Sequence, residues 1–96
     1  MARRLAMVDV MGCGTWKQVY AGGTFPDGGW RRECPGFEAS IRRISVHDDW
    51  MFAGGYRSGI VDTSTGRKLL WYDFNYRPDV ARRVADARLR KLMRGR

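Results

Sequence analysis

The side chains able to perform acid–base or nucleophilic chemistry are few and lie in one short segment. Ser45, His47 and the pair Asp48–Asp49 fall within five residues, and His47 is the single histidine of the chain. A hydrolytic triad needs a nucleophile, a base, an orienting carboxylate and an oxyanion hole, and neighbours along one strand do not assemble these parts. We therefore predict no catalytic residue and no enzymatic activity, and we expect His47 to lie on the surface at a strand end.

The two cysteines, Cys13 and Cys34, offer no metal framework. They lack C-x-x-C spacing and have one histidine to share, so we predict neither a zinc site nor another metal site. They could pair, but the N-terminal residues make a poor signal peptide, and we expect reduced thiols. The glycines at 12–14 and 54–55 match neither a P-loop nor a dinucleotide fingerprint, and we predict no cofactor.

Arginine and lysine carry the strongest signal in the sequence. The chain has 18 Lys+Arg against 10 Asp+Glu, a net charge of +8. Residues 76–96 hold eight of the bases and two of the acids, so +6 of the charge is concentrated there. Such a segment favours polyanions or an acidic protein face through Coulomb attraction and counterion release. GC-rich coding would also raise the share of arginine over lysine, yet it would not explain the clustering.

The basic segment is predicted to form a helix over residues 78–93. Pro78 suits the first turn because its missing N–H has no helical partner there. At 100° per residue, Arg83, Arg90 and Arg94 fall within about 40° of one another and form a cationic stripe. Lys91 is a further binding candidate on the same helix. Guanidinium groups spaced in this way could bridge successive phosphates.

An ordinary solvated helix surface also explains the same stripe. Asp79 and Asp86 stand four residues before Arg83 and Arg90, which is the favourable acid-first order for helix ion pairs. Cations in the last turn also complement the helix dipole. An acidic protein partner is a third interpretation of the stripe.

A second group of candidates surrounds a glycine-rich stretch over residues 22–36, interpreted as one long loop. Phe25 and Trp30 lie in it, and large aromatic residues in a loop of this length indicate docking or interaction. We predict a second basic patch from four arginines close in sequence to these aromatics. They are Arg31, Arg32, Arg42 and Arg43.

The remaining pattern predicts an α+β domain, with an antiparallel sheet of about five to six strands and one basic C-terminal helix. A chain of 96 residues is long enough for a single domain, 1–96, with a β body over about 5–74. Gly66 is expected to close a tight turn at 63–66. The expected strands cover 5–11, 15–21, 43–47, 50–53, 56–62 and 67–74. The expected core includes Ile44, Val46, Trp50, Phe52, Leu70, Tyr72 and Phe74, covered by the helix residues Val80, Val84, Ala85 and Leu92.

These features favour a small non-enzymatic protein that binds DNA or RNA through the helix and the second patch. The alternative is a protein-binding module, such as a phage-encoded accessory inhibitor of a host complex, or a structural subunit of an assembly. No apolar run is long enough to span a membrane, and we expect a cytoplasmic protein, in the host cytoplasm if it is viral. The sequence leaves the partner and the oligomeric state open.

Overall fold

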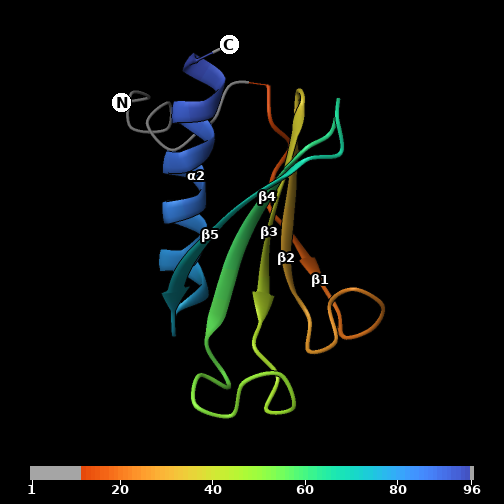
Figure 1. The fold of residues 1–96 in the computed structure, drawn as a ribbon, viewed down its shortest axis with the longest axis vertical. Helices are drawn as coiled ribbons and strands as arrows, with labels where there is room; N and C mark the ends of the chain where they lie inside the picture. The colour runs from red at the N-terminus through yellow and green to blue at the C-terminus, as the bar shows by residue number, and fades with distance from the viewer. Residues whose placement is uncertain (1–11, 96) are drawn as a thin grey trace.

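The protein is an antiparallel sheet with one long helix against one of its faces (Figure 1). The computed structural model describes residues 12–95, without the side chains of 70–73, so the strand expected at 5–11 lies outside the described residues. The five strands of the described chain are neighbours in sequence order, and the helix follows the last of them. They are β1 (Lys17–Val19), β2 (Gly29–Cys34), β3 (Phe37–Arg43), β4 (Tyr56–Asp62) and β5 (Lys68–Asn75), followed by α2 (Pro78–Arg94). The predicted α+β class is confirmed.

The second half of the sheet follows the predicted pattern. β4 has the bounds 56–62 expected from the sequence, and β5 is shifted by one residue from 67–74. The turn between them closes at Gly66, whose φ is +78° and whose N–H donates to the Asp62 carbonyl at 2.7 Å. The Asp62 carboxylate also accepts the backbone N–H of Ser64 at 2.9 Å. The turn therefore fixes the register of β4 against β5 by local chemistry.

The core lies between the helix and one face of the sheet, and small residues at the contact allow α2 to pack close to the strands. Ala39 on β3 and Ala81 and Ala85 on α2 are almost fully buried. Larger side chains fill the space on either side of them, with Ile41 and Leu89 fully buried. Alanine has no side chain beyond Cβ, so it lets the helix axis sit near the strands while neighbouring residues pack to high density.

The expected long loop at 22–36 is wrong, because its second half is strand β2. Pro35 and Gly36 form a two-residue turn in which Gly36 has a φ of +83°, and this turn brings β2 back against β3. The six residues before the turn pair with β3 over their whole length. The loop between β1 and β2 is therefore shorter than expected, and Trp30 lies on a strand.

The strands expected at 43–47 and 50–53 are also wrong. The β3–β4 ladder closes where Gly54 donates to the Ile44 carbonyl at 3.0 Å, and the residues between them form turns. The backbone N–H groups of Asp48 and Asp49 both donate to the Ser45 carbonyl at 3.0 Å. Ile44 is buried as expected, but this hairpin connection keeps three residues expected in the core exposed. They are Val46, Trp50 and Phe52.

Helix α2 ends one residue later than the predicted 78–93. Pro78 occupies its first turn as expected, with Gly95 at its C-terminal cap. The buried face of the helix differs from the expected one. Ala81, Ala85 and Leu89 are buried against the sheet, and of these only Ala85 was expected there. The other expected residues, Val80, Val84 and Leu92, are half-buried. Within residues 12–95, no helix has the length and apolar character needed to cross a bilayer.

The expectation of two reduced cysteines is wrong, because Cys13 and Cys34 form a disulfide with an S–S distance of 2.03 Å. Cys34 ends β2, and the chain before β1 runs alongside it, since the Gly14 N–H donates to the Glu33 carbonyl at 2.8 Å. The two cysteines are 21 residues apart in the sequence, so their proximity in space was not evident from the sequence. Disulfides are rare in the reducing cytosol, so this pair gives no support to a cytoplasmic location.

Candidate functional site

The outer side of α2 carries a row of cations. Arg83, Lys91 and Arg94 are exposed on it, and Arg90 is half-buried beside them. Arg83 and Arg94 are 11 residues apart, which corresponds to about 16 Å along the helix axis. The structure thus places the predicted stripe of Arg83, Arg90 and Arg94 on this side of the helix, together with the further candidate Lys91.

Asp86, which was a candidate neutralising partner for the stripe, faces the sheet instead. Its Oδ1 accepts a 2.7 Å hydrogen bond from Arg32 Nη1 and a 3.1 Å bond from Trp16 Nε1. Arg32 Nε also donates to the Gly14 carbonyl at 2.7 Å. Both charged residues are buried, with Arg32 6% and Asp86 9% exposed. This ion pair holds α2 on the sheet, and it removes the acid from the outer side of the helix.

Asp79, the second acid of α2, is held at the N-terminal end of the helix. Arg77 donates to both of its carboxylate oxygens, at 3.1 and 2.8 Å. These hydrogen bonds lower the pKa of Asp79 below its ordinary value, because they favour the charged carboxylate. Both acids that the sequence placed four residues before a stripe arginine therefore have partners elsewhere in the described structure.

The second basic patch expected from the sequence does not exist as one surface. Arg31 lies across strands β2 and β3, donating to Glu38 at 2.6 Å and to Glu33 at 2.7 Å. The hydrogen bond with Glu38 raises the pKa of Arg31 above its ordinary value. Arg32 is buried on the other face of the sheet because adjacent residues of a strand point to opposite sides. Arg42 and Arg43 are exposed at the end of β3, and as neighbours they also point to opposite sides.

The two aromatics proposed for an interaction loop serve the packing of the domain. Trp30 is half-buried on β2, and the guanidinium carbon of Arg82 lies 4.1 Å from the centre of its ring. Phe25 is 8% exposed, with Arg42 stacked 5.1 Å from its ring centre. Each pairing is a cation–π contact that shields the ring from solvent. Neither aromatic is available as an exposed anchor.

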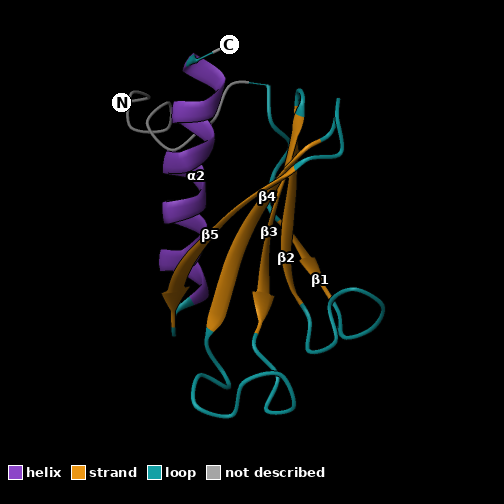
Figure 2. Ribbon diagram, viewed as in Figure 1, coloured by secondary structure: helices purple, strands orange, loops and turns teal. Residues whose placement is uncertain are grey.

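An apolar end of the molecule was missed by the sequence analysis. The β3–β4 connection exposes Val46, Trp50 and Met51, with Trp50 76% exposed. Figure 2 shows this connection and the β1–β2 loop extending from the same end of the sheet. Tyr76, just after β5, is 63% exposed and belongs to the same apolar end. Its ring contacts Phe74 edge to face, and Phe74 in turn contacts Phe52 of the β3–β4 connection edge to face. The signal in the sequence was the run 50–52, which we interpreted as a buried strand.

Comparison with known proteins assigns no relationship. The chain matches no protein-family model, no curated protein and no solved structure.

Proposed function

We propose that the chain is a small non-enzymatic nucleic-acid-binding protein that contacts phosphates through the outer side of α2. One observation carries the proposal: Arg83, Lys91 and Arg94 are exposed in one row, while Asp79 and Asp86 are bonded to residues outside that row. Because Arg77 and Arg32 engage these two carboxylates, the row keeps a positive field that favours a polyanion.

The length of the row suits a nucleic-acid backbone. Each strand of B-DNA advances about 3.4 Å per phosphate along the duplex axis, so about 16 Å spans several phosphates. Guanidinium groups bind phosphate oxygens with two parallel hydrogen bonds, and lysine adds a point charge. These contacts carry no sequence information by themselves, so we expect binding with weak sequence preference.

The test is a salt series of binding measurements by fluorescence anisotropy, with labelled duplex DNA, single-stranded DNA and RNA. In the variant Arg83→Ala/Lys91→Ala/Arg94→Ala, the slope of log K against log salt for duplex DNA should become shallower by about 2.7, or about 0.9 per lost phosphate contact. Arg67→Ala is the matched control, because Arg67 is an exposed cation in the β4–β5 turn. Binding that is absent at low salt, or a slope that the triple variant leaves unchanged, contradicts the proposal.

The apolar end favours a second candidate function, that of a protein-binding module. Exposed Trp and Met side chains that lie together are typical of protein interfaces. Such a module could be an accessory inhibitor of a host complex or a subunit of an assembly. In that case Trp50→Ala should abolish capture of one stoichiometric, nuclease-resistant partner, while the triple helix variant should retain it. Trp50 is the aromatic to substitute because it is 76% exposed, whereas the ring of Trp30 is stacked under Arg82.

A further inference from the structure

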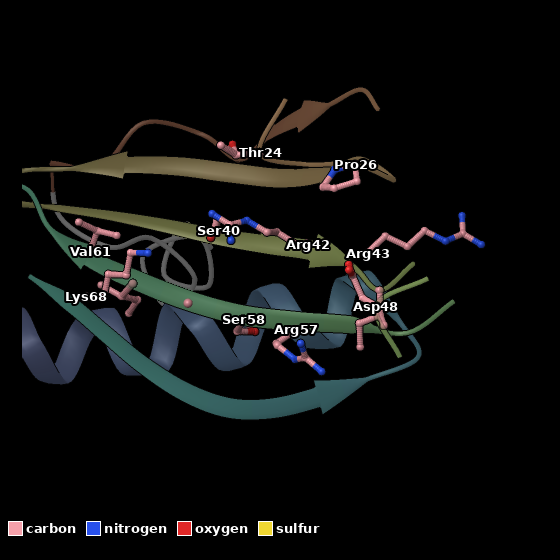
Figure 3. A pocket seen from close by; sticks show the side chains of 13 residues that line it. Thr24, Pro26, Ser40, Arg42, Arg43, Asp48, Arg57, Ser58, Val61 and Lys68 are labelled. Carbon is pink, nitrogen blue, oxygen red and sulfur yellow. The ribbon is translucent and has the colours of Figure 1, made fainter. Parts of the chain in front are cut away.

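The face of the sheet opposite α2 carries a hollow that arises where two small residues are paired on neighbouring strands. At its centre Ser40 of β3 pairs with Gly59 of β4, which gives a short side chain beside a residue that has none. Longer side chains surround this pair: in Figure 3 the Arg42 side chain extends toward Ser40, Lys68 lies toward one end of the hollow, and Arg57 extends away from Arg42 toward the other end. The result is a cavity of about 440 Å³, within the range of small-molecule sites.

The β1–β2 loop forms one wall of this cavity. Thr24 and Pro26 line it from that side, as Figure 3 shows. The ring of Phe25 anchors the loop, because it is buried against the Arg42 guanidinium at 5.1 Å. That contact also fixes Arg42 on the sheet surface, so part of the entropy cost of ordering a long side chain around a ligand is already met.

The charges in the hollow are predominantly positive. Arg42 and Arg57 stand directly opposite each other on β3 and β4, and like charges in that position destabilise a sheet. Asp49 approaches Arg57 at 3.7 Å, longer than a hydrogen bond, and Asp48 lies at the rim. Lys68 of β5 adds a third cation at the opposite side. A doubly charged anion in the hollow would offset this local excess of positive charge.

We propose that this hollow, defined by Ser40, Arg42, Arg57, Gly59 and Lys68, binds the phosphate group of a small phosphomonoester. Two guanidinium groups, an ammonium and a hydroxyl are donors that suit the several oxygens of a phosphate dianion. The cavity volume exceeds that of one such ion, so the ligand carries a further small moiety.

The site is independent of the nucleic-acid surface proposed for α2. Residues alternate between the two faces along a strand, and Ala39 and Ile60, the neighbours of Ser40 and Gly59, are buried under the helix. The sheet therefore separates the two surfaces. Failure of one proposal leaves the other intact, because the two sets of binding variants share no residue and only the control position, Arg67, is common to both tests.

The experiment is a titration of the 15N-labelled full chain, followed by amide chemical shifts at constant ionic strength. The probes are inorganic phosphate, ribose 5-phosphate and ribose, with chloride as the comparison anion. We expect saturable shifts confined to β3, β4 and the β1–β2 loop for both phosphates, with tighter binding of the sugar phosphate. Arg57→Gln and Lys68→Gln should each weaken binding about tenfold or more, as is typical for a charge-assisted hydrogen bond.

Two further variants separate a shaped site from a general field. Arg67→Gln removes a neighbouring exposed cation that does not line the hollow, and it should change the affinity by less than about twofold. Ser40→Leu keeps every charge but fills the centre, and it should abolish saturable binding. The proposal is overturned if phosphate shifts the spectrum no more than chloride does. It is also overturned if Arg67→Gln weakens binding as much as Arg57→Gln, or if Ser40→Leu binds like the wild type.

Discussion

The buried ion pair between Arg32 and Asp86 predicts a large and specific loss of stability. Substituting Asp86→Ala removes the acceptor of the 2.7 Å bond from Arg32 and of the 3.1 Å bond from Trp16, and it leaves a guanidinium that is 6% exposed without its counter-charge. Removing one partner of a buried pair costs about 3–5 kcal/mol. A domain of this size has a total stability of roughly 5–15 kcal/mol. The variant should therefore lose a large share of its free energy of unfolding.

The assay is equilibrium urea unfolding, followed by tryptophan fluorescence and far-UV circular dichroism. Glu33→Ala is the matched control, because it also removes a carboxylate that binds an arginine at 2.7 Å, but from a side chain that is 73% exposed. A surface pair of that kind contributes at most about 1 kcal/mol. Arg32→Met/Asp86→Leu removes both buried charges and should recover much of the loss.

Two results would refute this reasoning. If Asp86→Ala costs no more than Glu33→Ala, the ion pair does not hold the helix on the sheet. If the double variant loses as much as the sum of its two single variants, the cost comes from packing rather than from an uncompensated buried charge.

Two further predictions concern the crosslink and the helix N-terminus. Cys13→Ser/Cys34→Ser opens a loop closed across 21 residues and should lower the free energy of unfolding by about 3 kcal/mol. Urea unfolding of that variant checks this, and wild type in reductant should match it. Asp79 should titrate below the ordinary value of about 3.9 in an NMR pH series, since Arg77 lowers its pKa, and Arg77→Ala should raise the pKa toward that value. Because the pKa of Asp79 is lower in the folded than in the unfolded protein, this contact stabilises the fold at pH values above the unfolded-state pKa. The stabilisation is lost as the pH falls through the folded-state pKa. An Asp79 titration midpoint at or above the ordinary value would contradict the assignment.

Local chemistry in the sequence was sufficient for several elements. Pro78 and Asp79 mark the start of α2, and Gly66 closes the β4–β5 turn with a positive φ. The apolar runs on either side of that turn gave β4 its bounds and β5 its bounds to within one residue. The cationic row on α2 was predictable for the same reason, because helical periodicity alone sets which residues share a side.

Strand pairing and partner choice were decided by the tertiary structure. The glycines at 22–36 resemble a long loop until Pro35–Gly36 closes a hairpin, which makes β2 a strand and places Cys34 beside Cys13. Neither the opposition of Arg42 and Arg57 nor the hollow at Ser40 and Gly59 follows from local pattern, because both depend on the register of β3 against β4.

Residue types and their spacing alone set how much charge the chain carries, that most of the excess lies in one helix, and where that helix begins. The tertiary structure decided which of those charges face water. Asp86 and Arg32 are 54 residues apart, yet they pair in the interior because the sheet brings β2 under α2. Periodicity tells which side of a helix a residue occupies, whereas the choice of which side is buried belongs to the surface against which the helix packs.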